Sequence, residues 1–143
     1  MKNILVAVDM GESSKLLVDT AAELSKKFSA RVWVLHVAEP EPDFVGYDVG
    51  PRYIRINRAK DLRKEHVFVQ TYTEQLKANG IDADGLLIAG ATVEMILEEI
   101  SKLEIDFVIM GHHKHNLVYK IFTGSVDTAL VNKSKVPVLI IPI

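Results

Sequence analysis

The stretch Phe107–Val126, FVIMGHHKHNLVYKIFTGSV, decides how this sequence folds. It begins with an apolar run that is typical of a buried strand, and it turns at Gly111. It closes with Gly124 and Ser125, directly before a segment patterned as a helix. Free amide N–H groups and the positive end of a helix dipole would meet at such a junction, which favours an anion there. The stretch therefore predicts a phosphate cradle between a strand and a helix.

Segments patterned as strands and helices alternate along the rest of the chain. We predict strands at Ile4–Val8, Arg31–Val37, Leu86–Ala89, Phe107–Met110 and Val136–Pro142. We predict about four helices, near 17–28, 58–79, 92–103 and 124–133. The strand segments are nearly continuous apolar runs, as expected of parallel strands covered on both faces. This order predicts an α/β fold, with residues 1–143 forming one doubly wound domain.

The bulk composition is that of an ordinary globular protein. The chain has 143 residues, of which 48% are hydrophobic and 25% are charged, and its net charge is -2. This charge gives no reason to expect nucleic acid or an anionic membrane as a partner. The absence of cysteine excludes disulfides and thiolate chemistry. The short apolar run at the start does not resemble a signal peptide, so we expect a cytoplasmic protein.

Two candidate sites each keep a structural alternative. Gly124 and Ser125 are interpreted either as phosphate-binding residues or as an ordinary helix start with a serine cap. Asp9 follows the first strand, at the edge of the sheet where such folds bind ligands. It could bind ribose hydroxyls, or a cation through water, or it could cap the following helix.

The histidines do not form a convincing metal site. His112, His113 and His115 are close in sequence, but no carboxylate or cysteine lies beside them at ligand spacing. Neighbouring side chains of an extended segment point in opposite directions, which separates His112 from His113. His36, within a predicted strand, is expected to be a hydrogen-bonded structural residue. Lys114 either supplies positive charge to a phosphate or obstructs it.

Motifs of catalysis are absent from the sequence. It has neither the G-x-x-x-x-G-K-[ST] phosphate loop nor the G-x-G-x-x-G dinucleotide fingerprint. It also lacks a G-x-S-x-G elbow and an H-E-x-x-H pair. No acid–base pair is placed for hydrolysis. We therefore expect a binding protein rather than an enzyme.

Several segments together resemble the universal stress protein family. They are Asn3–Asp9, Val34–Val37, Val136–Pro142 and the closing motif of the quoted stretch. In nucleotide-binding members that motif reads G-x2-G-x9-G-[ST], after a strand that ends in Met. Here Met110-Gly111 and Gly124-Ser125 match, and nine residues separate Lys114 from Gly124. Lys114 stands where the family has its second glycine.

The resemblance implies a five-stranded parallel sheet of order 3-2-1-4-5 and a site for ATP, ADP or AMP, alone or with Mg²⁺. By similarity, backbone groups near Val37 hold the adenine beside Met110, and Asp9 and Gly111 meet the ribose. The site residues implied in this way are Ala7, Val8, Asp9, Val37, Met110, Gly111, Lys114, Gly124, Ser125 and Val126. The resemblance also implies a variable loop within the proline- and glycine-rich segment 39–57, as a lid or a partner surface.

A homodimer through the C-terminal strand, 136–142, is also expected. In the family's strand order this strand is an edge, and an exposed apolar edge is prone to pair with another strand. The alternative is an edge protected by Pro137 and Pro142.

Three functions compete on these grounds. The first is a stress-response protein that binds an adenine nucleotide and acts as a regulatory or interaction dimer. The second is a nucleotide-free interaction protein, in which Lys114 has closed the site. The third is an enzyme of the wider nucleotide-binding superfamily, which the missing catalytic groups disfavour. The first is preferred.

Overall fold

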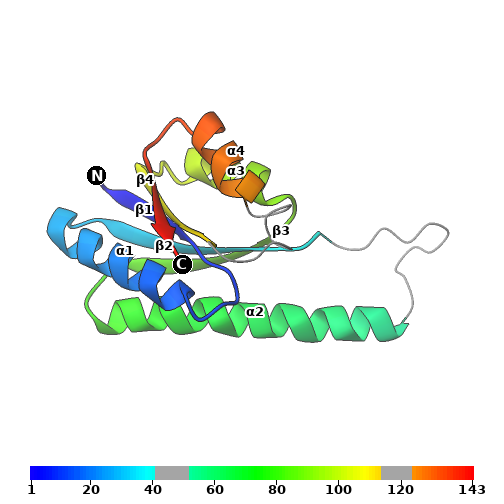
Figure 1. Cartoon of the computed structure of the whole chain (residues 1–143). Helices are drawn as coiled ribbons and strands as arrows, with labels where there is room; N and C mark the ends of the chain where they lie inside the picture. The colour runs from blue at the N-terminus through cyan, green and yellow to red at the C-terminus, as the bar shows by residue number, and fades with distance from the viewer. Residues whose placement is uncertain (41–51, 114–123) are drawn as a thin grey trace.

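The strands of this protein form one parallel sheet, as a computed structural model shows (Figure 1). The structure describes residues 1–40, 52–113 and 124–143. Its strands are β1 (Asn3–Ala7), β2 (Arg31–Ala38), β3 (Ala83–Ala89), β4 (Phe107–His112) and β5 (Val138–Pro142). Its helices are α1 (Ser14–Phe28), α2 (Arg52–Ala78), α3 (Thr92–Lys102) and α4 (Gly124–Lys133). The strand order is β3-β2-β1-β4-β5, which confirms the predicted α/β fold class and topology.

Helices cover both faces of the sheet because strand side chains alternate between the faces. Ile4 and Val6 of β1 belong to a buried cluster that α1 and α2 complete, whereas Leu5 belongs to a second cluster. Helices α3 and α4 complete that second cluster, for example through Ile96 and Leu130. Figure 1 shows α1 and α2 on one side of the sheet and α3 and α4 on the other. The apolar runs of the central strands β1 and β4 are thus buried on both faces.

Helix α2 is longer than its sequence pattern suggested. It begins at Arg52, whereas the prediction began it near Arg58 and assigned 38–57 to a loop. Residues 52–57 are helical although they precede the apolar stripe that predicts the helix, which consists of Leu62, Val69, Tyr72 and Leu76. That stripe is confirmed further along, since Val69 and Leu76 are buried. The rest of the predicted loop, 41–51, lies outside the described residues.

Strand β3 also begins earlier than predicted, at Ala83 rather than Leu86. Asp84 and Gly85 are typical turn residues, which hid this part of the strand. Gly85 instead allows α2 to approach the sheet closely. A Cβ atom at Gly85 would lie 2.6 Å from Oγ1 of Thr73 and 2.7 Å from Cγ1 of Val69. A strand glycine here therefore serves helix packing rather than a turn.

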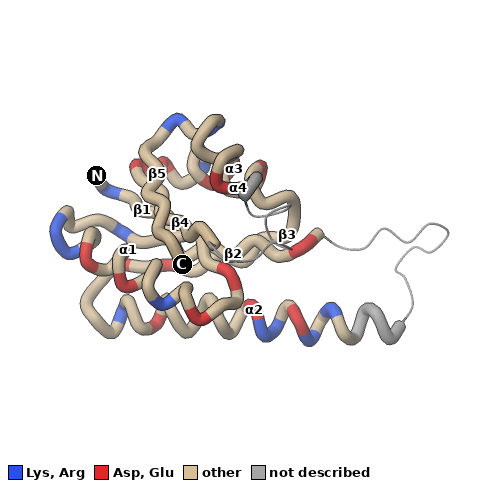
Figure 2. The backbone as a smooth tube through the Cα atoms, viewed as in Figure 1, with Lys and Arg blue, Asp and Glu red and all other residues tan. Residues whose placement is uncertain are grey.

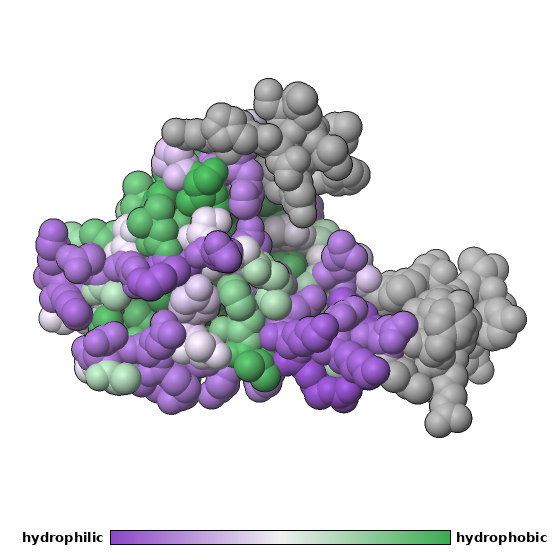
Figure 3. All heavy atoms as spheres, turned by 60° about the horizontal axis from the view of Figure 1, so that its bottom comes forward, coloured by the Kyte–Doolittle hydropathy of each residue, from purple (hydrophilic) through white to green (hydrophobic). Residues whose placement is uncertain are grey.

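The exterior mixes charges of both signs. Figure 2 shows acidic and basic residues interspersed along α1 and along α2. On the face turned forward in Figure 3, hydrophilic side chains predominate, with separate hydrophobic patches between them. In the described part of the chain, no helix has the length and apolar character needed to cross a membrane.

Candidate functional site

A hollow of about 210 Å³ lies at the carboxyl ends of β1, β2 and β4. Ligands of doubly wound sheets bind at such strand ends. The predicted site residues around it are Ala7, Val8, Asp9, Val37, Met110, Gly111 and Val126. Gly124 and Ser125 form the start of α4, next to Val126. Lys114 lies outside the described residues. The structure thus brings most of the predicted residues together, and their role in binding stays a prediction.

Other residues around the hollow did not emerge from the sequence pattern. They are Leu17, Leu35, His36, Thr92, Ile96, His113 and Ile143. The beginnings of two helices contribute three of these residues, Leu17 from α1 and Thr92 and Ile96 from α3. Each of these helices follows a strand whose end lies at the hollow or beside it. Ile143 is the last residue of the chain. Its position beside the hollow depends on tertiary packing, which the pattern of apolar and polar residues in the sequence does not predict.

Gly111 makes room for the C-terminal residue. Strand β4 does not end at Met110, as predicted, but continues through Gly111 to His112, which pairs with Pro142 of β5. The carbonyl of His112 then accepts a hydrogen bond from the amide of Ile143 at 2.9 Å. A Cβ atom at Gly111 would lie only 2.3 Å from Cδ1 of Ile143. The missing side chain at Gly111 therefore lets Ile143 form part of the wall.

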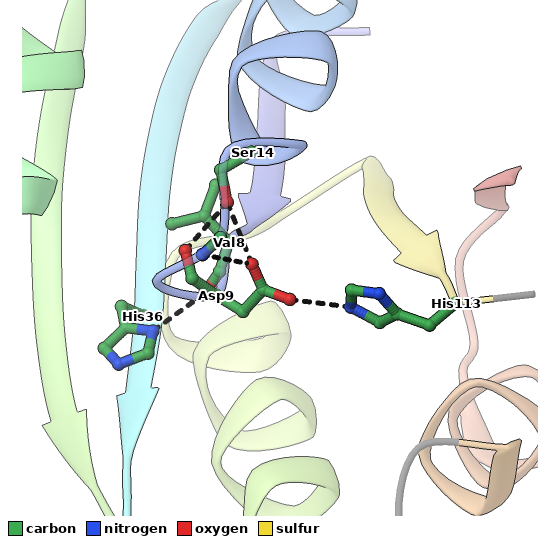
Figure 4. A network of polar contacts seen from close by, with 6 residues as sticks. Val8, Asp9, Ser14, His36 and His113 are labelled. Atoms are coloured by element: carbon green, nitrogen blue, oxygen red, sulfur yellow. Dashed lines mark hydrogen bonds and ion pairs between the residues drawn. The ribbon is translucent and has the colours of Figure 1, made fainter. Parts of the chain in front are cut away.

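Asp9 is fixed in place by contacts with the turn that follows β1 (Figure 4). Its Oδ1 accepts hydrogen bonds from the amide of Gly11 at 2.8 Å and from the hydroxyl of Ser14 at 3.2 Å. The same hydroxyl is 2.7 Å from the Asp9 carbonyl oxygen, to which it can alternatively donate. The N-cap residue of α1 is Ser13, so the alternative prediction that Asp9 caps this helix is wrong.

The other carboxylate oxygen of Asp9 meets an imidazole from across the hollow. Nε2 of His113 donates to Oδ2 of Asp9 at 2.7 Å (Figure 4). Burial raises the pKa of the Asp9 carboxyl, but the Gly11 amide and the His113 imidazole lower it by more. The net result is a pKa below the ordinary value, so Asp9 is a carboxylate at neutral pH.

His112, at the end of β4, and the adjacent His113 face different carboxylates, as expected of an extended segment. Whereas His113 reaches Asp9, Nδ1 of His112 donates to Oδ2 of Asp127 in the first turn of α4. Within residues 1–40, 52–113 and 124–143, no three carboxylate or imidazole side chains gather into a metal-binding group. His115, the third member of the predicted cluster, is not among the described residues. His112 thus pairs with Asp127, and His113 pairs with Asp9.

His36 has the structural role that was expected of it. Its Nδ1 donates to the carbonyl of Val8 at 2.8 Å, which ties the end of β2 to the end of β1 (Figure 4). The side chain is buried, and Nε2 lies 3.9 Å from Oε2 of Glu65 on α2. The amide of Val8 donates to Leu35 at 2.8 Å, so both backbone groups of Val8 are occupied. These contacts hold the strand end rigidly beside the hollow.

Asp127 is the polar residue that sequence reasoning missed. It is 5% exposed, and its Oδ1 has no hydrogen-bond partner among the described residues. The sequence shows Asp127 only as an acidic residue in the first turn of a predicted helix. Such residues are common and usually exposed, so nothing distinguished this one as buried. The pairing with His112 depends on the fold.

Comparison with known proteins places the chain in a family. The model of the universal stress protein family matches residues 1–142. The chain belongs to this family. Universal stress protein A of Yersinia pestis is 30% identical over 99% of this chain and 92% of its own length. The predicted resemblance is confirmed over nearly the whole sequence.

Solved structures of the family share the fold. A universal stress protein in complex with cAMP matches with a TM-score of 0.70 and 20% identity, covering 98% of this chain and 95% of that chain. The universal stress protein of Archaeoglobus fulgidus in complex with dAMP matches with a TM-score of 0.66 and 16% identity, covering 99% and 98%. At these identities the likeness shows the architecture alone.

Proposed function

We propose that this protein binds an adenine nucleotide (ATP, ADP or AMP) in the hollow, and that it acts as a regulatory or interaction dimer in the cytoplasm. The observation that carries the proposal is the meeting of apolar walls and a fixed carboxylate at one strand-end hollow. The complexes of related structures with cAMP and dAMP support the choice of an adenine nucleotide.

Each part of the nucleotide has a counterpart around the hollow. The adenine ring fits between Val37 and Met110, whose side chains are half-buried or buried. The ribose hydroxyls donate to Oδ2 of Asp9, which now accepts from His113. The phosphates meet the backbone amides at the start of α4, where Gly124 and Ser125 precede Val126. A Mg²⁺ ion would accompany a polyphosphate.

A binding role fits the groups present better than catalysis does. The carboxylate of Asp9 is held by a turn, and His113 and His112 are each engaged with a carboxylate. We therefore propose that any hydrolysis of ATP is weak and incidental to binding.

The proposed dimer forms through β5, residues Val138–Pro142. This strand is at an edge of the sheet, and its apolar side chains are only half-buried in one chain. A second copy would satisfy the backbone groups of the edge and cover those side chains. Analytical ultracentrifugation should show a dimer, which Ile140→Asp converts to a monomer. A parent protein that remains monomeric at high micromolar concentration would reject the dimer.

Thermal stabilisation tests nucleotide binding. A ligand that binds only the native state at 100 times its Kd stabilises it by about 2.7 kcal/mol. Millimolar AMP or ATP should therefore raise the melting temperature of the parent. Asp9→Ala should abolish the rise, whereas Asp19→Ala, which changes an exposed residue of α1, should preserve it. Mass analysis of small molecules released from the freshly purified, denatured protein would identify the nucleotide.

The departure of Lys114 from the family motif favours a second candidate, a nucleotide-free interaction protein. Under that account the parent shows no thermal shift with any adenine nucleotide, and Lys114→Gly creates one. A shift in the parent rejects this candidate.

A further inference from the structure

Both oxygens of the carboxylate that the proposed function assigns to the ribose already accept hydrogen bonds. Oδ1 of Asp9 accepts from the amide of Gly11 and the hydroxyl of Ser14. Oδ2 accepts from Nε2 of His113 at 2.7 Å. We propose that His113 is a specificity-determining residue, because it competes with ribose hydroxyls for Oδ2 and so weakens the preference of the hollow for ribose. The inference rests on the proposed function, since it concerns the ribose position of the same hollow.

The two side chains of this pair lie within the hollow. Asp9, which follows β1, and His113, which follows β4, both line it. Figure 4 shows the carboxylate and the imidazole ring pointing toward each other. Their side chains are 47% and 33% exposed, so a ligand can reach both from solution. A hydroxyl that approaches Oδ2 therefore meets the imidazole.

The hollow has little space for the ring and a ribose side by side. A carboxylate oxygen has two lone pairs, so the chemistry of Oδ2 alone would allow a second donor. With the ring of His113 in place, however, the hollow measures about 210 Å³, which is below the range of roughly 300–1,000 Å³ that is usual for ligand pockets. We therefore expect the imidazole to leave Oδ2 when a ribose binds there.

Displacing the imidazole costs affinity because the hydrogen bond that is lost is a strong one. Although burial raises the pKa of Asp9, hydrogen bonds from the Gly11 amide and the His113 imidazole lower it by more. Asp9 is thus ionised at neutral pH, and hydrogen bonds to an ionised group are stronger than those between neutral groups. A ribose hydroxyl gains its bond to Asp9 only when His113 loses its own. The hydroxyls of a ligand therefore contribute less affinity than they would at an unoccupied carboxylate.

Calorimetric titration with AMP and with dideoxy-AMP, the analogue without ribose hydroxyls, tests the proposal. His113→Ala should tighten the binding of AMP by about threefold to tenfold and change that of dideoxy-AMP by less than about twofold. Parent and variant with the two ligands form a double-mutant cycle, which isolates the effect of the imidazole on the hydroxyls. His66→Ala, which removes an exposed histidine of α2, should leave both affinities as in the parent.

A conservative variant separates hydrogen bonding from the size of the ring. His113→Gln keeps an N–H donor for Asp9, so it should bind the two ligands as the parent does. A His113→Gln protein that behaves like His113→Ala would overturn the inference, and so would equal tightening of both ligands by His113→Ala. Weaker AMP binding by His113→Ala would also overturn it, because the imidazole would then contact the ligand. These three outcomes leave the proposed function intact.

A measurement on the parent protein needs no substitution. The imidazole ¹⁵N signals of His113 should shift on saturation with AMP and remain nearly unchanged with dideoxy-AMP. Equal shifts with the two ligands, or no shift with AMP that is bound, would overturn the inference alone. Failure of AMP to bind either the parent or His113→Ala would reject the proposed function together with the inference.

Discussion

At one end of the hollow, Ala7, Leu35 and Val37 present apolar surface that continues into a buried core, whereas at the other end the paired side chains of Asp9 and His113 present charge. We call these the apolar end and the charged end. The side chains of the apolar end belong to strands of the sheet or directly contact its core, so substituting them should lower the free energy of unfolding. The charged end is held by the hydrogen bonds of Asp9 to the turn after β1 and to His113, which follows β4. Substitutions at the apolar end are therefore expected to affect mainly stability, and substitutions at the charged end mainly ligand binding.

The largest effect is expected from the apolar end. Leu35 is fully buried and also lines the hollow, so Leu35→Ala should reduce the free energy of unfolding by about 2–5 kcal/mol. Urea denaturation measures this change. Val67→Ala is the matched control, because Val67 is 61% exposed and should cost less than about 0.5 kcal/mol. Equal costs for the two variants would contradict the assignment of Leu35 to the core.

A smaller loss of stability is expected from a substitution at Gly111, which also lines the hollow. Gly111→Ala places a Cβ atom against Cδ1 of Ile143 and should cost about 1–3 kcal/mol through overpacking. Ile143→Val removes that δ-methyl group and should relieve part of the cost in the double variant. Urea denaturation of the four proteins gives the coupling energy. Strictly additive effects would show that Ile143 does not pack on Gly111.

The smallest effect is expected at Asp9, on the charged side, and it depends on pH. Because the native pKa of Asp9 is lowered, its carboxylate stabilises the fold at neutral pH. This contribution is lost as the pH falls below the ordinary value near 4 and through the native pKa. Asp9 is half-exposed, so solvent screens its charge, and Asp9→Asn should cost about 1 kcal/mol or less at pH 7 and a smaller amount at pH 3. A cost that is the same at both pH values would mean that the hydrogen bonds, and not the charge, hold the turn.

The sequence predicted the fold well because continuous apolar runs specify buried parallel strands. The start of α4 at Gly124 and the order of the strands match the structure. Errors arose where tertiary packing overrode local chemistry. Asp84 and Gly85 are residue types that indicate a turn, but both belong to β3. The glycine is needed there because α2 packs closely against this part of the strand.

The site was predicted less completely, for a related reason. Residues that lie in the strands or directly follow them, such as Asp9, could be placed from topology alone. Ile143 could not, because its position depends on packing against Gly111, which is remote in sequence. Packing of this kind leaves no periodic pattern in a sequence.

The central claim is that an adenine nucleotide occupies the hollow at the ends of β1, β2 and β4. The most direct test is a titration of the ¹⁵N-labelled protein with AMP, followed by amide chemical shifts. The account predicts saturable shifts concentrated at Val8, Val37, Gly111 and Val126, with the distant end of α1 around Phe28 unchanged. Saturating AMP that leaves the amides around the hollow unmoved, or moves those at Phe28 instead, would contradict it.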